Sequence, residues 1–178
     1  MVLDRIKKIG GYVDKLSTGV GAISFFCIAA LVIMNVVDVF LSQLFNVRIL
    51  GAVELSQRLL MCSVFAAFAY AQSKKSHITM TLIVAKLPRV PRFIIFTLMS
   101  VLSLGTIVLM TYAAWAQTVI SFESAYVTEV LKVPLWPFFV VETVSMAIFA
   151  VATLYDTIVY AIAIFRQDVA EHVQKDWT

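Results

Sequence analysis

The chain has 178 residues with a mean hydropathy of +0.93, and 61% of its residues are apolar against 14% charged. Soluble domains carry roughly 45–50% apolar and about 25% charged residues, so this composition excludes a soluble globular fold and predicts an integral membrane protein. The net charge of +3 is not arranged as a basic stripe interleaved with aromatic residues, which argues against nucleic acid as a partner.

The segment 1–15 alternates apolar and charged residues at helical spacing, which predicts an amphipathic helix on the membrane surface. The competing interpretation is a secretory signal peptide, which needs a shorter apolar region and a small-residue cleavage site. Because the apolar run that follows continues to Phe45, we expect the segment to be retained. That run, 16–45, is the first predicted transmembrane span, and it contains Asn35 and Asp38.

A short connection around 46–48 leads into the second predicted span, 49–72, so the first two spans are expected to be antiparallel neighbours. The basic connection that follows contains an apolar stretch, 77–87, which is too short to cross a bilayer and is predicted to be an interfacial helix ending near Pro88. His77 has two possible roles: a pH sensor beside lysines, or an interfacial side chain that orients the short helix. We favour the second role.

Two further spans complete the predicted fold. The third, 93–120, has no charged residue, and its small and hydroxyl side chains would let another helix approach closely. The polar loop 121–132 is interpreted either as a docking surface for a soluble partner or as a solvated linker. The fourth span, 133–165, is expected to begin at Pro134, and a cytoplasmic tail, 166–178, ends the chain. The predicted fold is all-α, with four transmembrane helices in a single membrane domain arranged as a four-helix bundle.

The placement of Lys and Arg predicts the orientation of the chain. Eleven of these residues lie in the N-terminal segment, the second connection and the tail. Only Arg48 and Lys132 lie on the other side, and Arg58 lies inside the second span. Because the excess of basic residues marks cytoplasmic segments, both termini are predicted to be cytoplasmic.

Four charged residues that fall inside the predicted spans form a candidate cluster: Asp38, Glu54, Arg58 and Glu142. At a rise of 1.5 Å per residue, they reach comparable depths, and Glu54 lies one helical turn before Arg58 on the same face. The functional interpretation is a proton or ion relay, or a substrate-binding cluster. The structural interpretation is a charge network or a subunit contact. It is favoured because a nearby cation keeps carboxylates charged and fixed, with Glu54 and Arg58 as the expected pair and Asp38 as the cross-helix partner.

The sequence contains no arrangement that predicts catalysis or cofactor binding. It has no nucleophile–base pairing, no glycine-rich phosphate loop and no spacing of metal ligands. Cys27 and Cys62 lie in apolar segments and are expected to behave as small apolar side chains. We therefore expect no enzyme activity, no metal and no cofactor. The spans also lack the inverted repeat and broken helices of a self-sufficient secondary transporter.

Short motifs along the chain are shared with a family of transporter subunits. They are Gly51-Ala52-Val53-Glu54-Leu55-Ser56, the stretch Ala67–Tyr70, the stretch Lys74–Met80 with His77, Leu87-Pro88, and Val133-Pro134-Leu135-Trp136. Their order and spacing, from about Leu16 to Asp156, resemble the small membrane subunit of TRAP transporters, the DctQ-type family. One departure is Thr81, where many members of that family carry an acidic residue.

The resemblance implies a tripartite uptake system in the bacterial inner membrane, in which this chain is the small permease subunit. Its partners would be a large membrane subunit, which carries substrate and sodium in an elevator-like motion, and a periplasmic substrate-binding protein. The system would take up an organic acid, such as a dicarboxylate, a keto acid or sialic acid, by symport. This chain would be a non-catalytic scaffold. The alternative is an autonomous, homo-oligomeric ion channel or carrier that uses the acidic cluster as its path.

Overall fold

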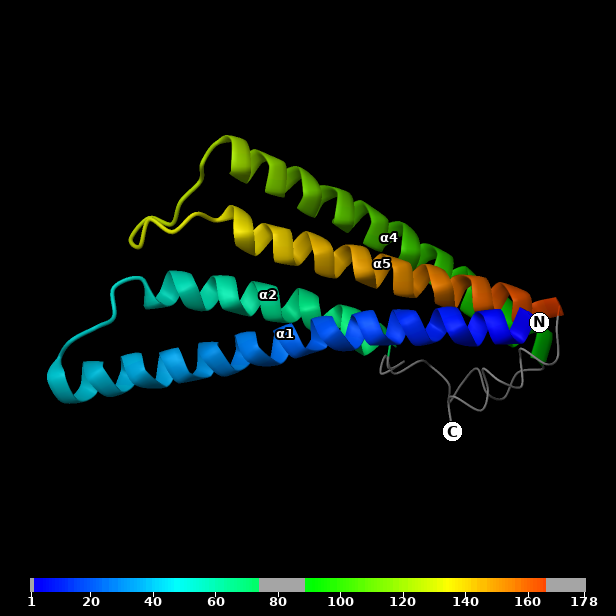
Figure 1. Cartoon of the computed structure of the whole chain (residues 1–178), viewed down its shortest axis with the longest axis horizontal. Coiled ribbons are helices and arrows are strands. Elements are labelled where there is room, and N and C mark those ends of the chain that lie inside the picture. The colour runs from blue at the N-terminus through cyan, green and yellow to red at the C-terminus, as the bar shows by residue number, and fades with distance from the viewer. Residues whose placement is uncertain (1, 74–88, 166–178) are drawn as a thin grey trace.

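A computed structural model describes residues 2–73 and 89–165, which form four long helices (Figure 1). The helices are α1 (Val2–Phe45), α2 (Ala52–Ser73), α4 (Arg89–Glu123) and α5 (Trp136–Phe165). Each contains a segment that is long and apolar enough to cross a membrane. The predicted all-α fold with four membrane-spanning helices is therefore confirmed.

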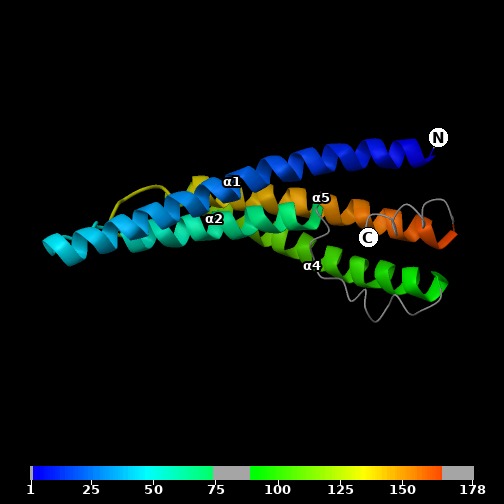
Figure 2. The ribbon, with the colours of Figure 1, turned by 90° about the horizontal axis from the view of Figure 1, so that it is seen from below.

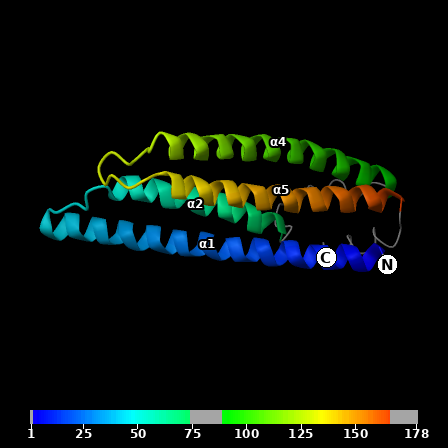
Figure 3. The same cartoon turned by 45° about the horizontal axis from the view of Figure 1, so that its top comes forward.

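The helices lie side by side in the order α1, α2, α5, α4 (Figure 3). Each packs along its neighbour in this row, and α1 also touches α5, whereas in the described part of the chain α4 makes only marginal contacts with α1 and α2. In Figure 1, α1 and α4 are widest apart at the end that holds the turn 46–51 and the loop 124–135. In Figure 2, a view at right angles, they are widest apart at the opposite end. The row is therefore twisted. The predicted four-helix bundle is thus an open row, because α4 packs along one helix instead of two.

The molecule has two distinct ends. The turn 46–51 and the loop 124–135 lie at one end, which we name the hairpin end (Figure 1). The starts of α1 and α4 and the end of α5 lie at the other, which we name the terminal end. This arrangement places the two connections of the helix pairs on one side of the four spans.

The helices differ strongly in length. α2 has 22 residues, which correspond to about 33 Å and match the roughly 30 Å hydrocarbon core of a bilayer. α1 has 44 residues and α4 has 35, or about 66 and 52 Å. The predicted surface helix 1–15 and first span 16–45 are one continuous helix in α1, because no proline separates them.

The fourth span begins later than the sequence predicts. Its helix, α5, begins at Trp136, and Pro134 lies before it, in an isolated β-bridge with Val127. Pro137, in the first turn of α5, takes the position expected for Pro134, since the first turn of a helix needs no backbone N–H donor there. The backbone amide of Leu135 also donates to the carbonyl of Tyr126 at 2.9 Å, which closes the base of the loop.

Other predicted boundaries shift by a few residues. α2 begins at Ala52 and α4 at Arg89, against predicted starts at residues 49 and 93. The predicted interfacial helix 77–87, together with His77 and Pro88, lies outside the described residues, and so does the predicted tail 166–178.

α1 and α2 approach closely at small residues. A Cβ added at Gly21 would lie 2.7 Å from Cδ2 of Tyr70, so glycine is what allows the ring to lie against α1. One turn further along α1, the buried hydroxyl of Ser24 donates to the carbonyl oxygen of Ser63 at 2.8 Å. Small and hydroxyl residues of this kind bring membrane helices together where no hydrophobic effect separates protein from lipid.

α4 and α5 are joined differently, by an aromatic cluster and two pairs of hydroxyls. The cluster is buried at the terminal end and consists of Phe93, Phe96, Val159 and Ala163. Hydroxyl oxygens then meet across the two helices at 2.6 Å between Ser100 and Thr157, and at 2.9 Å between Thr118 and Thr143. The contacts run from the terminal end to the first turns of α5, so α4 follows α5 along most of its length.

α2 and α5 form the central seam of the row. The rings of Phe68 and Phe149 stack with centroids 6.2 Å apart. Near the end of α2, the amide of Gln72 donates to the carboxylate of Asp156 at 2.8 Å. This seam connects the two helix pairs and sets the position of the charged residues between them.

Candidate functional site

Asp38 is engaged by the turn that follows its own helix. Its carboxylate accepts a hydrogen bond from the backbone amide of Ile49 at 2.8 Å. The amide of a turn is thereby satisfied by a side chain ten residues or so earlier in the chain, which fixes the way α1 passes into α2. The structure therefore assigns Asp38 to the first turn of the molecule, whereas the sequence placed it across from Arg58.

Glu54 joins the turn 46–51 to the loop 124–135 at the hairpin end. It lies in the first turn of α2, and both of its carboxylate oxygens accept from the backbone amide of Val130, at 3.1 and 3.3 Å. Gly51, with φ of +78°, lies directly against Leu131, and a side chain at this glycine would collide with that leucine. The turn 46–51 is thus attached to the loop 124–135 by one charged and one steric contact.

Arg58 lies over an aromatic ring of α5. Its guanidinium carbon is 6.0 Å from the centroid of the Phe139 ring, which is the geometry of a cation–π contact. Across residues 2–73 and 89–165, no ion pair joins Arg58 to Glu54, and each has a different partner on the loop or on α5. The two residues lie on α2 as predicted, but each has a partner other than the one predicted.

Glu142 is the most enclosed of the four charged residues, at 8% exposure. It lines a groove of about 320 Å³ between α2, α4 and α5. Three methionines and two phenylalanines form most of the wall, Ala113 and Ala114 contribute the α4 side, and Gln117 is the only other polar side chain of the lining. The groove follows from the open row, because α4 covers α5 without reaching α2.

The structure therefore separates the predicted cluster into three contacts and a groove. Asp38 and Glu54 act on backbone amides at the hairpin end, Arg58 lies against α5, and Glu142 lies in the groove. The interpretation of the four residues as structural and subunit contacts remains a prediction.

Sequence reasoning did not find several polar contacts that stabilise the row. The amide of Asn35 donates to the hydroxyl of Ser56 at 3.0 Å between α1 and α2, and the hydroxyl of Ser73 donates to Asp14 at 2.7 Å. The signal was present, since an amide in an apolar span needs a partner. Only the rotation of each helix about its axis tells which partner it meets.

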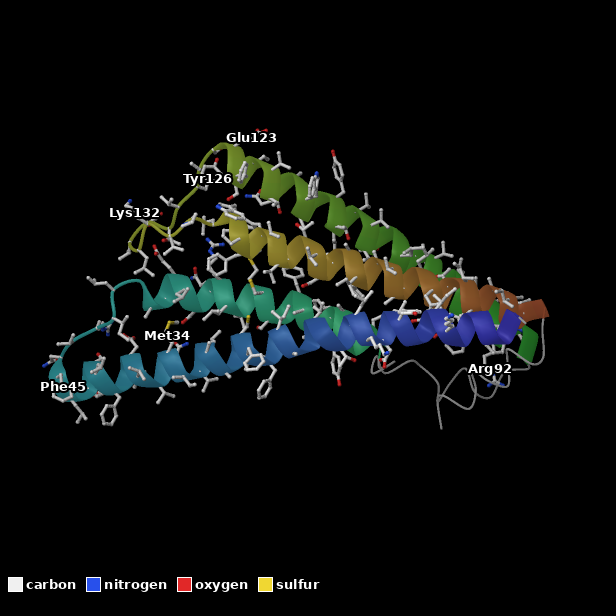
Figure 4. All side chains as sticks on the ribbon, in the orientation of Figure 1. Met34, Phe45, Arg92, Glu123, Tyr126 and Lys132 are labelled. Carbon is white, nitrogen blue, oxygen red and sulfur yellow. The ribbon has the colours of Figure 1, made fainter. Side chains whose placement is uncertain are left out.

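The charged side chains at the surface mark the two ends. Figure 4 shows Glu123, Tyr126 and Lys132 at the hairpin end, and Arg92 at the terminal end. Between these ends the outer faces of α1 and α4 are apolar and exposed, with Phe26 on α1 at 70% and Tyr112 on α4 at 72%. The described surface is therefore a wide apolar band between two polar ends, as a membrane protein requires.

Comparison with known families identifies the chain. Residues 19–162 match the sequence model of the DctQ component of tripartite ATP-independent periplasmic transporters. The chain belongs to the DctQ family. This match covers all of the central seam, the hairpin end and the groove. A comparison with curated proteins found no match. The chain is thus a component of a TRAP transporter and a multi-pass membrane protein, and its family is one of transporter components, which work with a large membrane subunit and a binding protein.

Four of the DctQ-type positions lie at the hairpin end. Gly51 and Glu54 make the contact with the loop, Ser56 accepts from Asn35, and Pro134 closes the base of the loop in its bridge with Val127. The stretch Ala67–Tyr70 lies further along α2, where Tyr70 packs against Gly21. His77 and Pro88 are outside the described residues.

Proposed function

We propose that this chain is the non-catalytic scaffold subunit of a sodium-coupled, binding-protein-dependent importer of an organic acid, such as a dicarboxylate or sialic acid. In this proposal, the large membrane subunit carries substrate and sodium in an elevator-like motion, and the present chain enlarges its static part. The observation that carries the proposal is the membership in the DctQ family over residues 19–162.

The engagement of the charged residues supports a scaffold. Asp38 and Glu54 accept from backbone amides, and Arg58 lies on a ring, so these three side chains stabilise the fold. A proton or ion relay would need titratable groups in succession within hydrogen-bonding reach of one another. Because the three side chains have separate partners at separate places, they favour a static role for this subunit over a path for protons or ions through it.

The open row supports attachment to a larger membrane protein. The two edge helices each leave an outer face with large apolar side chains exposed: Phe25, Phe26, Ile33 and Phe40 on α1, and Leu98, Leu109, Tyr112 and Trp115 on α4. In a bilayer such faces meet either lipid or another subunit, and neither occupant is opposed by a hydrophobic cost. An open row offers more of this surface than a closed bundle of the same length.

We also propose that the hairpin end faces the periplasm and that both termini are in the cytoplasm of a bacterial inner membrane. The support is the distribution of basic residues along the chain, with Arg48 and Lys132 in the two connections at the hairpin end and eleven others in the N-terminal segment, the second connection and the tail. In this orientation the loop 124–135 is placed on the side of the binding protein.

The test is purification of the tagged chain from native membranes in a mild detergent, followed by mass analysis. We expect a large, many-span membrane protein in stoichiometric amount. Liposomes containing both subunits, supplied with the binding protein, should then take up labelled organic acid only with an inward sodium gradient. Recovery of the chain only with itself, together with ion conduction by the purified chain in liposomes, would contradict the proposal and favour an autonomous channel or carrier.

A further inference from the structure

Glu142 differs from Asp38, Glu54 and Arg58 because no described residue is a partner for it. Its side chain is more than nine-tenths buried, yet in the described part of the chain no group donates to its carboxyl or pairs with it. Burial of such a group without a donor is costly. Acidic side chains inside membranes face protein partners or water-filled cavities. The carboxyl lines the groove and is therefore open to a donor that enters the groove from outside the described residues.

The groove in which Glu142 lies has the size and lining of a docking site. At about 320 Å³ it is about twice the volume of an engineered cavity that admits benzene, so it has room for one long side chain. Ala113 and Ala114 keep the α4 wall low, which lets another backbone approach. Methionine side chains from all three helices adapt to the shape of an incoming group.

We propose that this groove receives a transmembrane helix of the large subunit and that a Lys or Arg of that helix pairs with Glu142. The inference rests on the proposed function, because it names the surface by which this subunit holds its partner. Charge complementarity supports it, since a buried carboxylate in an apolar groove is satisfied best by a cation that donates hydrogen bonds. The amide of Gln117 is a second polar contact for the same helix.

A lipid headgroup is a poorer occupant than a protein helix. Glu142 is the seventh residue of α5, about 9 Å along the axis from the start of the helix, so a headgroup would have to leave the interface to reach it. A lipid phosphate would also be repelled by the carboxylate. Arg58, the nearest candidate inside the chain, is held over the ring of Phe139.

The first test measures the affinity between this chain and the large subunit recovered with it, in lipid nanodiscs. Glu142→Gln keeps the shape of the side chain and removes its charge, so we expect binding at least tenfold weaker. The matched control is Glu129→Gln, a carboxyl on the exposed loop at the hairpin end, which should leave the affinity unchanged. Equal affinities for Glu142→Gln and the native chain would overturn the proposal.

The second test locates the partner directly by a photo-crosslinking amino acid at one of two positions of α4. Gln117 lines the groove, whereas Tyr112 is 72% exposed and lies outside the lining. We expect a stronger crosslink to the large subunit from Gln117 than from Tyr112, because only Gln117 lines the groove. Crosslinks from Gln117 to lipid alone, while the complex remains intact, would show a lipid-filled groove and overturn the proposal.

Two further outcomes separate this inference from the proposed function. One outcome is that Arg58→Ala and Glu142→Gln weaken binding by the same factor and that the double variant binds no more weakly than either. Glu142 would then act through a pair with Arg58 within the chain, and the inference fails. In that case the complex of the native chain still forms, so the scaffold function stands. If the native chain binds no large subunit at all, the proposed function itself fails.

Discussion

The pairs α1–α2 and α4–α5 solve the same packing problem in different ways. The first pair is joined by the short turn 46–51 and approaches closely at Gly21, where glycine leaves room for an aromatic ring. The second is joined by the longer loop 124–135 and is held by an aromatic cluster and hydroxyl pairs. The groove beside Glu142 lies where the second pair meets α2.

The difference indicates which of the two helix pairs has groups left to bind another subunit. Association of helices in lipid depends on close packing and hydrogen bonds, since apolar surface alone gives no advantage over lipid. The α1–α2 pair uses both within the chain, as at Ser24 and Ser63. The α4–α5 pair joins two pairs of hydroxyls across its contact, and no described residue donates to the carboxyl of Glu142, which is the group that the proposed partner helix would meet.

The largest expected effect comes from breaking the close approach of the first pair. Gly21→Ala places a Cβ 2.7 Å from the ring of Tyr70 and should cost about 1–3 kcal/mol, because the ring atoms nearest to it are close to the backbone of α2. The measurement is the free energy of unfolding in mixed micelles. Gly19→Ala is the matched control, since no atom lies within 4 Å of its added Cβ, and it should not destabilise. Equal losses in the two variants would contradict the comparison.

A smaller effect is expected at the contact between the two pairs. Glu54→Ala removes the acceptor of the Val130 amide and should weaken the loop contact by about 1 kcal/mol, since the bond is exposed. Hydrogen–deuterium exchange at Val130 should then be about fivefold faster. Glu123→Ala, an exposed carboxyl at the same end that does not adjoin Val130 in sequence, should leave this exchange unchanged. Unchanged exchange in Glu54→Ala would show that the loop holds its place without the carboxylate.

The smallest effect is expected within the second pair. A double-mutant cycle with Ser100→Ala and Thr157→Val should give a coupling of about 0.6 kcal/mol in the free energy of unfolding, the usual size for a hydrogen bond between membrane helices. Ser103→Ala, at an exposed position of the same helix, should give no coupling with Thr157→Val. A coupling larger than the Gly21→Ala effect would reverse the order of the two pairs.

The fold was predictable because length and apolarity alone determine spans. The segments 93–120 and 16–45 contain too few charges to be anything else, and both lie inside helices of the structure. The ends of helices were less predictable, as Pro134 illustrates. Proline suits the first turn of a helix and also the strand-like base of a loop, and the backbone partner at Val127 decides between the two.

The helix on which each charged residue lies was predictable, whereas its partner was not. A rise of 1.5 Å per residue gives the position of Asp38 along α1 or of Glu142 along α5 from sequence alone. The partner depends on the rotation of each helix and on its neighbours in the row, which sequence spacing does not specify. Glu54 shows the limit most clearly, because its partner is an amide of Val130, 76 residues away in a loop.

The unequal helix lengths have a consequence for the lipid around the protein. The apolar part of α1, 16–45, spans about 45 Å, so it fits a 30 Å hydrocarbon core only at a tilt of roughly 48°, far above the usual 20° or so. By the same relation α2, about 33 Å long, fits at a tilt of roughly 25°, yet the two helices are packed together. One of them must be mismatched, and the membrane around the pair must thicken or thin to accommodate it. The acyl-chain length of the surrounding lipid therefore acts directly on the geometry of this subunit.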